Sequence, residues 1–139
     1  MRHKGMTDAR RLADFAGRWS LSRHITPVAG PHAQVEGDAH WRAADGGLTY
    51  VEKGLMTLAG QTPLHAERRY FWAEDLSVHF DDGRFFHKVP KTGGVAHHWC
   101  DPDTYHVTYD FTDWPRFEVH WRVQGPRKDY RAVTHYSRL

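Results

Sequence analysis

The chain has 139 residues and a formal net charge of +2, which suits one domain around a single hydrophobic core and gives no support to nucleic-acid binding. Its single cysteine excludes an intramolecular disulfide and favours a reducing compartment. The N-terminus lacks the apolar core of a signal peptide, and no apolar run approaches about 20 residues, so we expect a cytoplasmic protein without a membrane partner.

The first predicted element is a short helix over residues 8–16, "DARRLADFA". Thr7 is placed to cap its N-terminus, and Leu12 and Phe15 fall on one face. Gly17 then ends the helix. One short helix before the first strand suits a plug over one end of a barrel.

After Gly17 the chain alternates between apolar and polar residues in short runs separated by turn residues, which predicts β-strands. The sharpest turn signal is Asp82-Gly83, a pair typical of two-residue hairpins. The ten predicted strands span residues 18–26, 34–43, 47–58, 63–73, 75–81, 84–90, 94–100, 104–112, 116–124 and 128–138.

Ten strands joined by short connections predict an all-β fold with two economical forms, a sandwich or an up-and-down barrel. We expect the ten-stranded antiparallel barrel, formed by residues 1–139 as a single domain, because closing the sheet removes both exposed edges.

The strand register can be predicted by folding each hairpin symmetrically about its turn. The predicted pairs include Trp41–Leu48, Tyr50–Tyr70, Glu52–Arg68, Val78–His87, Phe80–Phe85, His87–His98, Tyr109–Val119 and Trp121–Ala132. In this register one face stays mostly apolar or aromatic through all ten strands, and a one-residue slip would move it to the other side. We therefore expect that face to line the interior, with a Trp-rich floor and polarity that rises toward the mouth.

The polar and aromatic side chains of the inward face and the rim are the candidate ligand contacts. They are Arg23, Tyr50, Glu52, Arg68, Tyr70, His87, His98, Tyr105, Lys128 and Tyr130. Glu52 facing Arg68 is interpreted either as an ion pair that fixes the register or as a pair that orients a ligand or transfers protons.

His87 facing His98 has three interpretations: two structural histidines, a haem or metal ligand pair, or a general acid–base. No zinc-type spacing such as C-x-x-C or H-E-x-x-H occurs, so we predict no metal site and leave the cofactor unknown. Cys100 falls on the same face near Tyr105, either as a small core residue or as a nucleophile beside His98.

The stretch "FAGRWSL", residues 15–21, resembles the start of the first strand in the calycin superfamily of lipocalins and fatty-acid-binding proteins, with Gly17 and Trp19 matching their G-x-W motif. The resemblance implies that an arginine of the last strand stacks on this tryptophan, and Arg138 is the candidate. The chain also resembles a small bacterial domain family of unknown function in "DGRFFH" (82–87), "HWCDPDTY" (98–105) and "GPRKDY" (125–130).

The predicted barrel, its polar interior and the resemblance to calycins together predict non-covalent binding of a small, partly aromatic or anionic molecule. One alternative is a small barrel enzyme that uses Tyr, Arg and Glu for acid–base chemistry. Another is haem or metal binding through His87 and His98. The small-molecule ligand is the expected partner, and a homo-oligomer is compatible with the sequence.

Overall fold

The structure is a computed structural model that describes residues 8–100 and 102–139, with Cys100 described by its backbone alone. Ten strands follow one four-residue helical turn, η1 (Leu12–Phe15). The strands are β1 (Gly17–Pro27), β2 (Ala33–Ala44), β3 (Gly47–Leu58), β4 (Leu64–Ala73), β5 (Ser77–Phe80), β6 (Phe85–Lys88), β7 (Gly94–Cys100), β8 (Asp103–Asp110), β9 (Phe117–Gln124) and β10 (Asp129–Arg138).

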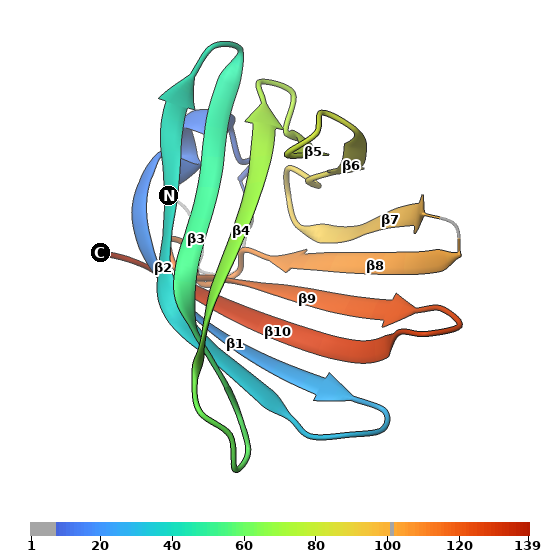
Figure 1. The fold of residues 1–139 in the computed structure, drawn as a ribbon. Helices are drawn as coiled ribbons and strands as arrows, with labels where there is room; N and C mark the ends of the chain where they lie inside the picture. Colours follow the sequence, from blue (N-terminus) through green and yellow to red (C-terminus); the bar gives the residue numbers. More distant parts are fainter. Residues whose placement is uncertain (1–7, 101) are drawn as a thin grey trace.

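All ten strands belong to one antiparallel sheet in the order β6-β5-β4-β3-β2-β1-β10-β9-β8-β7. The sheet curls into a nearly closed barrel in which β2–β4 cross β8–β10 at a steep angle (Figure 1). The described parts of β6 and β7 share no backbone ladder, so two edges remain where full closure was expected. The four residues of β6 end just before Pro90, which has no N–H to extend a ladder.

The N-terminal element differs from the predicted helix over residues 8–16, because only the 3₁₀ turn η1 is helical. The backbone N–H of Arg10 donates to Lys91 O at 2.7 Å, so the chain before η1 lies against the β6–β7 connection instead of coiling. The predicted cap, Thr7, lies outside the described residues.

An aromatic cluster centred on Phe15 fills the floor of the barrel. Phe15 is 0 % exposed, and its ring centroid lies 5.1–6.0 Å from those of Trp41, Trp72, Phe111, Trp114 and Phe117. Such aromatic pairs contribute beyond the area they bury. The floor is therefore a packed core.

The G-x-W region has the arrangement that the calycin resemblance implies. The guanidinium carbon of Arg138 lies 4.3 Å from the ring centroid of Trp19, and Arg138 Nη1 donates to Ala16 O at 2.6 Å. The indole N–H of Trp19 donates to Phe15 O at 2.9 Å. The last strand thus fixes both the entry to β1 and the plug residue Phe15.

The observed register confirms the pairs Tyr50–Tyr70, Glu52–Arg68, Val78–His87, Tyr109–Val119 and Trp121–Ala132. The Trp41–Leu48 prediction is wrong by two residues, because the β2–β3 turn is the two-residue Asp45-Gly46 and Trp41 pairs with Tyr50. A shift of two keeps every side chain on its predicted face.

The Phe80–Phe85 pair is also wrong, and here the cause is a β-bulge. The β5–β6 register shifts after Val78, so His79 pairs with Phe85 and Phe86 is the extra residue. Phe86 turns inward at 0 % exposed, whereas Phe85 points outward at 53 %. A bulge commonly redirects one side chain in this way.

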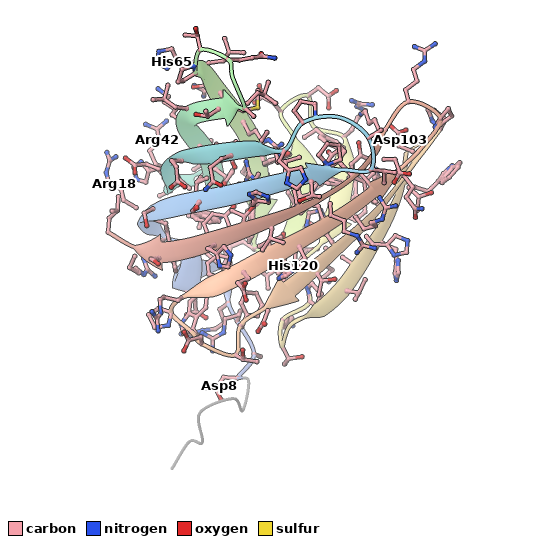
Figure 2. The ribbon with its side chains drawn as sticks, turned by 90° about the horizontal axis from the view of Figure 1, so that it is seen from below. Asp8, Arg18, Arg42, His65, Asp103 and His120 are labelled. Atoms are coloured by element: carbon pink, nitrogen blue, oxygen red, sulfur yellow. The ribbon has the colours of Figure 1, made fainter. Side chains whose placement is uncertain are left out.

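The outer face of the sheet carries charged and polar side chains, and Figure 2 shows Arg18, Arg42 and His65 at the periphery of the molecule. Within residues 8–100 and 102–139, no helix has the length and apolar character needed to cross a membrane.

Candidate functional site

A small cavity lies in the interior above the packed floor. Its volume is about 30 Å³, and a water molecule needs about 10–15 Å³ on this scale. Six of the predicted site residues line it, namely Arg23, Tyr50, Glu52, Arg68, Tyr70 and His87. The remaining wall is apolar or aromatic and includes Trp41, Phe86 and Trp121.

The polar wall is organised by a buried ion pair between Arg23 and Glu52, rather than by the expected pair of Glu52 and Arg68. Arg23 Nη1 lies 2.6 Å from Glu52 Oε2 and Nη2 lies 2.9 Å from Oε1, a bidentate contact. Arg23 Nε donates to Thr134 Oγ1 at 2.8 Å. Burial alone would raise the pKa of Glu52, but the hydrogen bonds and charge of Arg23 hold it below its usual range.

Two buried tyrosines extend this pair toward β10. The Tyr50 hydroxyl donates to Glu52 Oε1 at 2.6 Å and lies 2.8 Å from the Tyr136 hydroxyl. Because the single proton of Tyr50 is used by Glu52, Tyr136 must be the donor in the tyrosine pair. Burial raises the pKa of Tyr136 to about 12, so this chain of hydroxyls is protonated at neutral pH.

Arg68 is the second cation in the cavity wall, and it takes no part in the ion pair between Arg23 and Glu52. Its backbone is paired with Glu52 as predicted, but no carboxylate of the described residues lies within ion-pairing distance of its guanidinium. The guanidinium carbon lies 5.4 Å from the ring centroid of Trp121. Arg23 and Glu52 neutralise each other, so Arg68 supplies the net positive charge of the cavity wall.

His87 is buried at 2 % exposed, and its Nε2 lies 2.8 Å from the Tyr109 hydroxyl. Burial, with a smaller contribution from His98, lowers the pKa of His87 to about 3, so the imidazole is neutral. His98 does not pair with His87 across a ladder, because β6 and β7 lie at opposite ends of the sheet order. Among the residues that the structure describes, no three His, Cys, Asp or Glu side chains gather as metal ligands.

The mouth is more open than the floor. Six inward-facing residues there are half-buried, namely Tyr70, Phe80, His98, Tyr105, Trp121 and Tyr130. Phe80 stacks on Phe86 with a centroid distance of 4.6 Å, and His98 meets the same ring edge-on at 5.2 Å. A surface depression of about 530 Å³ shares two residues, Arg68 and Tyr70, with the cavity. Its lining consists of Arg68, Arg69, Tyr70, Phe80, Asp81 and Asp82.

The turn between β9 and β10 places Lys128 at the rim. Its Nζ lies 3.3 Å from Asp103 Oδ2 and donates to the Tyr105 hydroxyl at 3.4 Å. A Cβ at Gly125 would lie 2.0 Å from Asp103 Oδ1, so a larger residue here would displace this carboxylate. The side chain of Cys100, the other candidate near Tyr105, lies outside the described residues.

Several cavity residues were absent from the sequence-based site. Tyr136 shares the parity of Tyr130 and Ala132 on β10, which was a usable signal. Phe86 reaches the cavity only because of the bulge, and a strict period of two assigns it to the outer face. Trp41 and Tyr109 also line the cavity, although the sequence analysis did not include them among the candidate ligand contacts.

The nearly closed antiparallel sheet, the plugged floor and the partly polar interior define a calycin-like β-barrel. Residues 15–138 match the Family of unknown function (DUF6314), and the chain belongs to that family. Among solved structures, the chain is similar to the S-type phycobiliprotein lyase CPES from Guillardia theta, with 9 % identity, a TM-score of 0.64, and coverage of 92 % of this chain and 90 % of that one. This likeness concerns the fold. No curated protein matches the sequence.

Proposed function

We propose that the protein binds a small aromatic anion without covalent attachment, in the mouth half of the barrel. The observation that carries the proposal is Arg68, a half-buried cation in the cavity wall with no carboxylate partner among the described residues. A half-buried cation without its own carboxylate carries an electrostatic cost, and an anionic ligand group would supply the missing counter-charge through charge-assisted hydrogen bonds.

The surroundings of Arg68 support an aromatic ligand body. Trp121 lies beneath the guanidinium, and the stacked rings of Phe80 and Phe86 face the same space. Arg68 and Tyr70 line both the cavity and a depression of the surface, so the guanidinium lies between the interior and the solvent side. Ligand sites commonly combine such an apolar wall with a few placed polar groups.

The acid–base alternative has less support. Both oxygens of Glu52 already accept hydrogen bonds, and Arg23 keeps its pKa low, whereas a general base works best with a pKa near neutral pH. Glu52 and Arg23 are better suited to support the wall that holds Arg68 and Tyr70 in place.

Fluorescence titration with two matched probes tests the proposal. 1-Anilinonaphthalene-8-sulfonate is an aromatic anion, and N-phenyl-1-naphthylamine has the same aromatic frame without the charge. We expect the wild-type protein to bind both. Arg68→Gln should weaken the binding of the anionic probe by about tenfold or more, since a hydrogen bond to a charged group is worth about 1.5–3 kcal/mol. The affinity for the neutral probe should not change.

The control is Arg42→Gln, which removes the same charge from an exposed position on the outer face of β2. It should leave both titrations unchanged. An equal loss in the two variants would show a non-specific charge effect, and failure of the wild-type protein to bind either probe would contradict the proposal.

A further inference from the structure

Two polar atoms in the cavity wall have no hydrogen-bond partner among the described residues. They are the indole Nε1 of Trp41, which is 1 % exposed, and Nδ1 of His87, which is 2 % exposed. Both residues line the same cavity. Buried polar groups are nearly always satisfied, so each such atom requires an explanation.

The hydrogen count of the tyrosine chain shows that it cannot donate into the cavity. Tyr136 donates to Tyr50, Tyr50 donates to Glu52, and Arg23 fills the remaining Glu52 positions. Both hydroxyl protons are therefore used inside the wall. The indole N–H of Trp41 differs, because it can only donate and it has no acceptor.

The His87–Tyr109 pair also keeps one proton unused in either tautomer. If the Tyr109 hydroxyl donates to Nε2, the proton of the neutral imidazole is on Nδ1, where it has no acceptor. If Nε2 donates to Tyr109, the hydroxyl proton of Tyr109 is the unused one. With Trp41, the wall thus holds two donors that lack acceptors.

We infer that the cavity is a subsite for a neutral hydrogen-bond acceptor, best matched by a carbonyl oxygen, at the inner end of the ligand. The inference rests on the proposed function. It adds the order in which the chemical groups of the ligand lie between the mouth and the interior of the barrel. The anionic group meets Arg68 toward the mouth, the aromatic body lies against Phe86 and Trp121, and the carbonyl accepts from Trp41 and from the His87–Tyr109 pair.

The charge distribution explains why the inner group is neutral. The charged side chains that line the cavity are Arg23, Glu52 and Arg68, and the first two neutralise each other. Burial keeps His87 uncharged, with its pKa lowered to about 3. A second carboxylate at the inner end would have no cation of its own, and burying an unpaired charge is strongly unfavourable.

The test uses ligands of equal shape that differ in the acceptor alone. 4-Acetylbenzoate and 4-isopropenylbenzoate differ by C=O in place of C=CH₂, and the corresponding biphenyl carboxylates provide a second length. We expect the acetyl compound of at least one length to bind about tenfold more tightly to the wild-type protein in calorimetric titration, since leaving buried donors unpaired is costly.

Trp41→Phe removes the indole N–H and should reduce this preference to less than about threefold. Trp19→Phe is the matched control, because it lies in the same aromatic cluster but its N–H already donates to Phe15 O. It should lower stability without changing the preference. The comparison within the wild-type protein needs no variant, so it remains decisive if Trp41→Phe does not fold.

The outcomes separate the two proposals. Equal binding of the acetyl and isopropenyl compounds at both lengths would overturn the carbonyl subsite and leave the proposed function standing. A preference that persists in Trp41→Phe, or that disappears equally in Trp19→Phe, would overturn the assignment of the donor. Binding of none of the four carboxylates would overturn the proposed function and this inference together.

Discussion

The floor and the mouth of this barrel are built from similar aromatic residues, but they are packed for different purposes. At the floor, Phe15 and Trp19 are 0 % exposed, and the ring of each contacts the rings of Trp41 and Phe117. At the mouth, Tyr70, Tyr105 and Trp121 face inward but remain half-buried, and Arg68 lacks an anion among the described residues. The difference indicates that the floor holds the fold together, and it supports the proposal that the mouth half binds the ligand.

Among the changes considered, removal of the Phe15 side chain from the floor should lower the free energy of unfolding the most. Phe15→Ala leaves a void among five aromatic rings, and such truncations cost about 3–5 kcal/mol. Urea denaturation should show this loss, while the folded variant still binds N-phenyl-1-naphthylamine. Phe85→Ala, at an outward position, should change stability by about 0.5 kcal/mol or less. Equal losses in the two variants would contradict the packed floor.

Breaking the buried ion pair of Arg23 and Glu52 should cause the next largest loss in the free energy of unfolding. Glu52→Gln leaves Arg23 buried without its counter-charge, and we expect a loss of about 3 kcal/mol in urea denaturation. Glu67→Gln is the control, because its contacts with Lys53 and Arg69 are exposed and should contribute about 1 kcal/mol at most. A loss below about 1 kcal/mol for Glu52→Gln would show that the pair is not a structural support of the wall.

A smaller, pH-dependent effect should come from His87. Its pKa is about 3 in the folded protein and about 6.5 when unfolded, so the unfolded chain binds an extra proton between these values. Stability should therefore fall as the pH drops, by about 2 kcal/mol between pH 7 and pH 5, which is roughly 1.5 pH units at 1.36 kcal/mol each.

Urea denaturation at pH 7 and pH 5 measures this difference in each variant. His87→Phe should remove most of it, whereas His65→Phe, at an exposed position on β4, should retain it. A wild-type protein that is equally stable at both pH values would show that His87 is not held neutral by burial.

The sequence predicted the strands and their faces well because alternation with a period of two directly encodes which side chains are buried. The two-residue error at Trp41 left every face unchanged, since a shift of two preserves parity. This is why Arg23, Glu52 and His87 were correctly placed on the inward face although the β2–β3 turn was misplaced.

The sequence could not supply contacts that depend on the curvature of the sheet. Glu52 was expected to pair with Arg68, its neighbour across the ladder, but its ion pair is with Arg23 on β1, two strands away. The bulge that turns Phe86 inward has no glycine or proline to mark it. Closure between β6 and β7 likewise depends on the summed twist of ten strands, which no single hairpin reveals.

The line between β6 and β7, here called the seam, is the part of the barrel wall that should resist separation least. Spreading any neighbouring pair from β6 round to β7 would break main-chain hydrogen bonds, whereas parting β6 from β7 breaks none among the described residues. The barrel can therefore yield along one line while remaining stiff elsewhere. Enlarging the interior beyond its volume of about 30 Å³ by parting this seam would leave every ladder of the described sheet intact.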